Sequence, residues 1–182
     1  MRSVYPIKVV VNSESEKFTL KFAREAATIL ENDDRVSCEI NTNGLLLKGV
    51  WDLDIQHAIK NIKEKIEGSI VYTDYTIEYR KDGSILLEPV MIVEVTCPEL
   101  YMGDVMGDMN RRRGIVENLI DSNKGKLIKA KIPLSELIGY YDYLNNLFPY
   151  EWVVNVEFFE YQQAPNPDGT DPNEPVSKAL RA

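Results

Sequence analysis

The sequence predicts an α+β protein built from two consecutive split β-α-β units, and three observations support this fold class. The order strand, helix, strand, strand, helix, strand occurs twice along the 182 residues. Each half has a polar turn between its second and third predicted strands, at Asn43-Gly44 and at residues 122–125. Each half also carries two segments in which apolar residues recur at helical spacing. This pattern is typical of the ferredoxin-like arrangement, in which two helices cover one face of an antiparallel sheet.

The first half opens with a short β-branched run that predicts a strand. Ser13 and Ser15 are suitable N-caps for a helix whose apolar positions recur around Phe22. Asp52 is a suitable cap for a second helix, which Gly68 ends. The expected elements are strands at residues 5–12, 35–41, 45–50 and 69–80, and helices at about 13–32 and 52–66.

The second half repeats this order after a tight turn at residues 81–84. Pro98 favours a helix start, Gly114 favours its end, and Ser135 is a suitable cap for the last helix. The expected elements are strands at residues 86–96, 115–121, 126–132 and 150–161, and helices at 99–112 and about 135–147. In the helix at 99–112 we expect an inner face formed by Leu100, Val105, Met106 and Met109, with Gly103 and Gly107 allowing close approach of helix and sheet.

Composition divides the chain into two predicted domains and a tail. The domains are residues 1–82 and 83–162, because the turn at 81–84 separates the two repeated patterns. Residues 163–182 contain four of the nine prolines and few large apolar side chains, so we expect this tail to be disordered.

Charge and hydropathy exclude several function classes. The net charge of −8 opposes indiscriminate binding of nucleic acid, so free DNA is not an expected partner. No apolar run approaches the roughly 20 residues needed to span a bilayer, and we expect a cytoplasmic protein. Arg111, Arg112 and Arg113 form the one local concentration of positive charge, at the predicted end of a helix. There they either complement the helix dipole and stay solvated, or bind phosphate groups.

No residue pattern points to catalysis. The chain has no glycine-rich phosphate-binding loop followed by lysine and serine or threonine, and no nucleophile paired with a base. His57 is the single histidine, and together with Cys38 and Cys97 it makes no convincing zinc site. We therefore expect no catalytic residues, no metal and no cofactor, and we expect the chain not to be an enzyme.

Several contiguous segments resemble elongation factor G, a translational GTPase. Residues 87–95 (LEPVMIVEV), 98–114 (PELYMGDVMGDMNRRRG) and 132–144 (IPLSELIGYYDYL) are similar to its fifth, C-terminal domain. Residues 47–55 (LKGVWDLDI) are similar to its third domain, with Gly49, Asp52 and Leu53 in agreement and Trp51 and Asp54 in place of a usual glycine and histidine.

The same resemblance shows which parts of the family this sequence lacks. Only residues 81–84 stand where the family carries its fourth domain, and the GTPase domain that uses GTP and magnesium has no counterpart here. Either the fourth domain has been excised or the chain is a naturally reduced relative.

The resemblance implies a ribosome-associated module of protein synthesis that is non-catalytic without a GTPase domain. Its implied partner is the large ribosomal subunit near the stalk base, with Arg111, Arg112 and Arg113 as candidate contacts. A loop in which the family carries Gly-Arg-Gly reads FPYEW at residues 148–152, and Glu151 there reverses the usual charge. The alternative is a pair of protein-interaction domains that has kept the fold and lost the ribosome.

Overall fold

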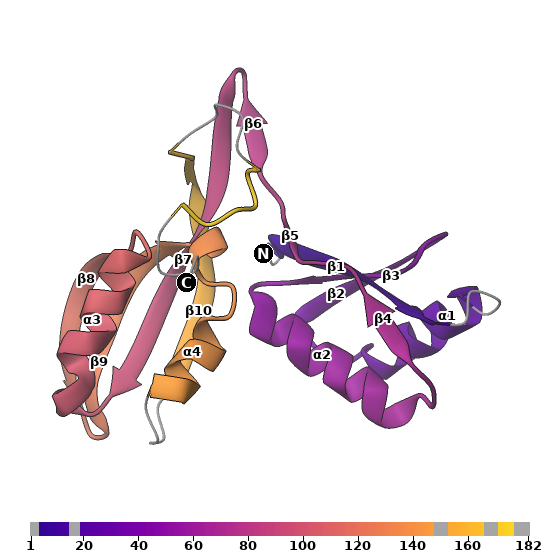
Figure 1. Ribbon diagram of the computed structural model, residues 1–182, viewed down its shortest axis with the longest axis horizontal. Helices are drawn as coiled ribbons and strands as arrows, with labels where there is room; N and C mark the ends of the chain where they lie inside the picture. The colour runs from indigo at the N-terminus through magenta and orange to yellow at the C-terminus, as the bar shows by residue number, and fades with distance from the viewer. Residues whose placement is uncertain (1–3, 15–18, 148–152, 166–170, 177–182) are drawn as a thin grey trace. The chain divides into compact units, whose positions relative to one another are not determined.

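A computed structural model of the chain describes residues 4–14, 19–147, 153–165 and 171–176. The chain divides into two compact units, Met1–Glu78 and Tyr79–Ala182 (Figure 1). Each unit contains one antiparallel sheet with helices packed on it, so the predicted α+β, ferredoxin-like fold is confirmed. None of the described helices is both long and apolar enough to cross a membrane.

The sheet of the first unit has the strand order β2-β3-β1-β4, and β5 also pairs with β1. Helices α1 and α2 both pack on this sheet and contact each other. Ile7, Val9 and Val11 of β1 are buried, whereas the residues between them are half-buried, as expected for a sheet that is covered on one face. The elements are β1 (Ile7–Ser13), α1 (Thr19–Ile29), β2 (Val36–Asn41), β3 (Gly44–Gly49), α2 (Asp52–Lys65), β4 (Ile70–Tyr72) and β5 (Thr76–Ile77).

The second unit repeats this topology with the order β10-β7-β9-β8, while β6 pairs with the first part of β7. Met91, Val93 and Val95 of β7 form its buried side together with Ile128 and Ala130 of β9. The elements are β6 (Arg80–Asp82), β7 (Ile85–Cys97), η2 (Glu99–Tyr101), α3 (Met102–Arg111), β8 (Ile115–Ser122), β9 (Gly125–Pro133), η3 (Leu134–Glu136), α4 (Tyr140–Leu147) and β10 (Val153–Gln163).

One predicted strand, at residues 69–80, is three separate strands in the structure. The hydroxyl of Thr73 accepts the N–H of Val10 at 3.0 Å, and this side-chain bond stands where a ladder bond would otherwise continue. Beyond the interruption, β5 still pairs with β1, but β6 pairs with β7 of the second sheet. The second unit therefore begins at Tyr79, four residues before the boundary that the turn at 81–84 predicts.

Each unit places a glycine of its central hairpin against the carbonyl of a neighbouring segment. Gly44 has a φ of 133°, and a Cβ added to it would lie 2.6 Å from the carbonyl oxygen of Val11. Gly125 has a φ of 125°, and its added Cβ would lie 2.2 Å from the carbonyl oxygen of Cys97. Both positions require glycine for conformation and for space.

Candidate functional site

Helix α3 and the arginines at its end carry the residues that the sequence singles out. The helix follows Pro98 through the 3₁₀ turn η2 and packs on β8 and β9. Val105 and Met109 are buried, as predicted. Leu100, which the periodicity also assigns to the inner face, is 82% exposed. The reason is that residues 99–101 form a 3₁₀ turn, which has three residues per turn and so does not extend the buried α-helical stripe.

Arg112 is completely buried in the second unit. Its Nε donates to Asp108 Oδ2 at 2.7 Å, and its Nη1 donates to the carbonyl oxygen of Glu136 at 2.7 Å. The guanidinium lies over the rings of Tyr140 and Tyr143, at 4.8 and 4.9 Å from their centroids. Arg112 is therefore a core residue that ties α3 to η3 and α4. The expectation that it sits at a solvated helix end is wrong.

Arg113 ends α3 in the left-handed conformation, with a φ of 61°, and turns back toward β7. Its guanidinium pairs with the carboxylate of Glu88 and lies 3.4 Å from Oε1 of Glu136. The side chains of Glu88 and Glu136 are 5% and 0% exposed, and that of Arg113 is 24% exposed. Burial raises the pKa of Glu88, which the charge and hydrogen bond of Arg113 partly oppose. Arg113 mainly neutralises these buried acids.

Arg111 has the most exposed side chain of the three arginines, at 65%. Its Nη2 lies 3.8 Å from Asp108 Oδ1, a loose pairing that leaves most of the guanidinium accessible. The three consecutive arginines thus occupy three different environments, and they do not form one basic surface. Whether Arg111 or Arg113 contacts a ribosome stays a prediction.

The lysines of β9 are also paired with acids. Lys126 lies 3.7 Å from Glu99 and is paired with Asp121, and Lys129 lies 3.0 Å from Glu94. Lys131 lies 2.7 Å from Glu117. Among the described residues of β9, every lysine thus has a carboxylate within 4 Å. The second unit therefore has charges of both signs along β9, which leaves this strand with little capacity to attract polyanions over a distance.

The outward face of α3 is bare of side chains at its centre. Gly103 and Gly107 are exposed, and a Cβ added to either would meet nothing within 4 Å. They therefore point away from the sheet, and the prediction that they allow close helix–sheet approach is wrong. Arg111 follows Gly107 by four residues and so lies on the same side of the helix, and the exposed Leu100 precedes the helix in η2. We call Leu100, Gly103, Gly107 and Arg111 the α3 face.

The α3 face is not explained by stability. A glycine inside an exposed helix costs about 1 kcal/mol relative to alanine, and α3 contains two of them within ten residues. An exposed leucine at the edge of the same stripe adds apolar area without burial. Together these features give a surface that another molecule can approach down to the helix backbone.

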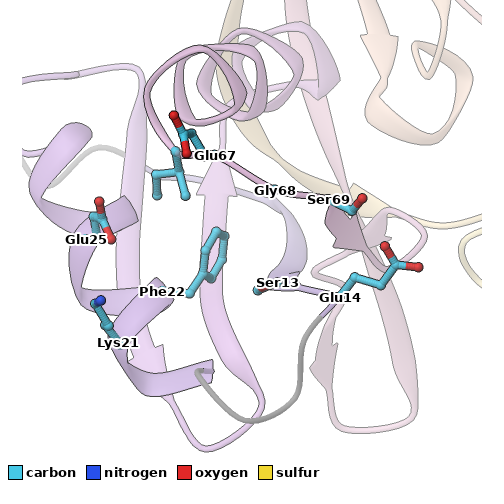
Figure 2. Close-up of a pocket in the computed structure, with 9 residues that line it drawn as sticks. Ser13, Glu14, Lys21, Phe22, Glu25, Glu67, Gly68 and Ser69 are labelled. Carbon is cyan, nitrogen blue, oxygen red and sulfur yellow. The ribbon is translucent and has the colours of Figure 1, made fainter.

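The first unit contains an open hollow of about 600 Å³ between the start of α1 and the end of α2 (Figure 2). The ring of Phe22 lies at its centre, and Lys21 and Glu25 of α1 stand on one side of it. Glu14 and Glu67 add two more acids to the lining. These side chains supply no nucleophile with an adjacent base, and among the described residues no group of His, Cys, Asp and Glu could hold a metal ion.

A small polar cluster occupies the N-terminal end of α2. Arg35 binds Asp33 with both ends of its fork, at 2.8 and 2.7 Å, and its Nη1 lies 3.2 Å from Nδ1 of His57. Because a guanidinium can only donate, this contact requires a neutral His57, and burial together with Arg35 and Lys60 lowers its pKa. Burial raises the pKa of Asp54 to about 6, although its carboxylate accepts the backbone N–H of Trp51. This hydrogen bond caps the helix, so the cluster has a structural role.

The burial of Arg112 has a signal in the sequence that the run of arginines hides. Val105, Met109 and Arg112 are spaced i, i+4, i+7, so helical periodicity places Arg112 on the buried side. The run of three arginines masks this spacing because it resembles a charged terminus. The loop at 148–152, including Glu151, lies outside the described residues.

Comparisons with known proteins agree with this architecture. Residues 85–170 match the family model described as elongation factor G C-terminus. A crystal structure of a protein from Thermus thermophilus matches with a TM-score of 0.62 and 15% sequence identity, over 91% of this chain and 42% of that one. At this identity the likeness shows the fold, and the chain spans less than half the length of that protein. The family match covers β7 to β10, so the second unit is the part of the chain that is similar to the elongation factor G C-terminus.

Proposed function

We propose that the chain is a non-catalytic module of protein synthesis that associates with the large ribosomal subunit, near its stalk base, through the α3 face. One observation carries the proposal: the segment that matches the elongation factor G C-terminus includes α3, and α3 presents two open glycines that the fold does not use. The first unit supplies a second ferredoxin-like domain, and its resemblance to the third domain of the family supports the same function.

The chemistry of the α3 face suits a crowded contact with RNA or ribosomal protein. Gly103 and Gly107 allow a phosphate backbone or a protein segment to come close to the helix. Arg111 can pair with phosphate oxygens through its planar fork, and the exposed Leu100 adds apolar contact. Because one accessible arginine dominates, we expect weak binding. A plot of the logarithm of the association constant against the logarithm of the salt concentration should have a slope of about −1.

Co-sedimentation of the protein with purified large subunits between 50 and 300 mM salt tests this proposal. We expect Arg111→Glu to abolish binding at every salt concentration. Lys124→Glu is the matched control, because it reverses one exposed positive charge of the same unit in the turn between β8 and β9. Equal loss with both variants would show that net charge matters and the α3 face does not. Equal binding by the wild type and by both variants would refute the proposed contact.

A second candidate function is protein–protein interaction without the ribosome. The carboxylate pairing of Lys126, Lys129 and Lys131 favours it, because a surface with paired charges suits a protein partner better than RNA. On this alternative the large subunit does not bind at any salt concentration, and Arg111→Glu changes nothing in the same assay.

The proposed module acts without nucleotide. Phosphate binding of the translational GTPase kind needs a glycine-rich loop with a lysine and a magnesium ligand, and the sequence contains no such grouping. We expect titration calorimetry with GTP and magnesium to show no binding. A micromolar affinity for GTP would contradict the non-catalytic assignment.

A further inference from the structure

The segment Asp171 to Val176 lies against the second unit, although its composition predicts disorder. Its backbone turns at Asp171, whose carboxylate accepts the N–H of Asn173 at 2.9 Å, and Glu174 N–H donates to the carbonyl oxygen of Asp171 at 3.0 Å. Val176 N–H then donates to Oε1 of Glu136 at 2.9 Å. This last bond joins the tail to a carboxylate that is completely buried.

The tail covers the ion cluster formed by Arg113, Glu88 and Glu136. A hollow of only about 30 Å³ separates the two sides, with Tyr79, Glu88 and Ser135 on the domain side. Pro172 and Val176 line it from the tail. The pairing of β10 with β7 extends to the edge of this hollow, where Ala164 N–H donates to the carbonyl oxygen of Leu86 at 2.9 Å.

Charge does not explain why the tail docks there. Arg113 is shared between the two buried carboxylates of Glu88 and Glu136, so the ion cluster offers the tail no unpaired positive charge. Asp171 and Glu174 bring two more acids to the same hollow. Pro172 and Val176 are both exposed, so the attraction comes mainly from the backbone hydrogen bond to Glu136, while the acids oppose it.

We propose that residues 171–176 form an intramolecular clasp that closes over the Glu88–Arg113–Glu136 cluster and keeps it buried. When the clasp opens, Glu136 loses one of its donors and the buried carboxylates meet water. The clasp carries the acids Asp171 and Glu174, which repel the acids of the cluster. Added salt screens this repulsion and therefore favours the closed state. This salt response is opposite to that expected for ribosome binding, so the two proposals fail or succeed separately.

Hydrogen exchange and thermal unfolding of the full chain test the clasp with two variants. Val176→Pro removes the N–H that bonds Glu136, whereas Val176→Ala keeps it and trims a side chain that is 47% exposed. We expect Val176→Pro to speed amide exchange in residues 171–175 and 134–137, and to lower Tm by roughly 4 to 8 °C relative to Val176→Ala.

The wild-type chain gives an independent readout, since tail protection should increase between 50 and 500 mM salt. A chain that ends at Pro165 should show the same faster exchange in residues 134–137 as Val176→Pro. The clasp would be overturned if the proline and alanine variants behaved alike, if residues 171–176 exchanged at the rate of an unstructured peptide, or if salt reduced their protection.

Discussion

In the first unit, Asp52 is the one charged side chain among the described buried residues, and the remaining core is apolar. The second unit has the same strand order but buries Glu88, Asp108, Arg112 and Glu136. The apolar core is stabilised by many small contacts, each of which can be weakened separately. The ionic core depends on a few strong contacts between α3, η3 and β7, and the loss of one partner leaves another charge buried without compensation.

This difference shows that one topology can be stabilised by a mainly apolar core or by a core that also contains buried ion pairs. In the second unit, Arg112 and Arg113 fix the end of α3 against η3 and β7, which holds the α3 face in place. The first unit has no such ion cluster among its described residues, and its paired charges, such as Asp33 with Arg35, lie at the surface. Four sets of substitutions test this comparison.

The largest effect is expected from Arg112→Met. This change leaves Asp108 buried without its main partner and removes a donor from the Glu136 carbonyl, so we expect a loss of about 3–5 kcal/mol in the free energy of unfolding. Chemical denaturation followed by circular dichroism measures it. The double variant Asp108→Leu with Arg112→Met should recover a large part of the loss. A single variant as stable as the wild type would show that the cluster is not structural.

The hairpin glycines provide a test in which both units should respond. We expect Gly125→Ala to cost about 2–3 kcal/mol, because the added Cβ would meet the Cys97 carbonyl at 2.2 Å and φ is positive. Gly44→Ala should cost somewhat less, since its contact with Val11 is 2.6 Å. Denaturation curves of the two variants give the order directly, and the reverse order would contradict the packing described here.

Asp54 makes the first unit sensitive to pH. Its pKa is raised to about 6 in the folded state, so its contribution to stability is present below its ordinary pKa of 3.8 and is lost as the pH rises through about 6. We expect the wild type to lose about 1–2 kcal/mol between pH 4 and pH 7 relative to Asp54→Asn, after a discount for partial exposure. Denaturation midpoints across this range measure the difference, and parallel curves would refute it.

The smallest effect is expected from Arg111→Ala. Its guanidinium is mostly exposed and only loosely paired with Asp108, so the free energy of unfolding should change by less than about 0.5 kcal/mol. Comparison with Arg112→Met shows how far the stability contribution of an arginine depends on its burial, because the two residues are adjacent in the sequence. A large loss on Arg111→Ala would show that the exposed arginine also supports the ion cluster.

The sequence predicts the element order and both hairpins because these depend on local patterns of apolar residues and on glycine. It does not predict the interruption at Thr73, which depends on a contact with the distant Val10. The burial of Arg112 follows from its helical spacing, but the run of three arginines masks that signal, and its partner Glu136 is distant in sequence. The prediction that Leu100 and Gly103 face the sheet is wrong because it relied on their apolar or small character. Helical spacing instead separates Gly103 from Val105 and Met109. An apolar or small residue predicts burial only on average.

The most direct test of the proposed function uses Gly103→Ala with Gly107→Ala. Both added methyl groups enter open space, so the variant should be more stable than the wild type by about 1–2 kcal/mol. Its affinity for the large ribosomal subunit should nevertheless fall by about tenfold or more, because the methyl groups hold the partner away from the helix. Thr28→Ala on the exposed side of α1 is the matched control, which should leave the affinity unchanged. A double variant that is more stable and binds the subunit as tightly as the wild type would show that the α3 face is not the contact.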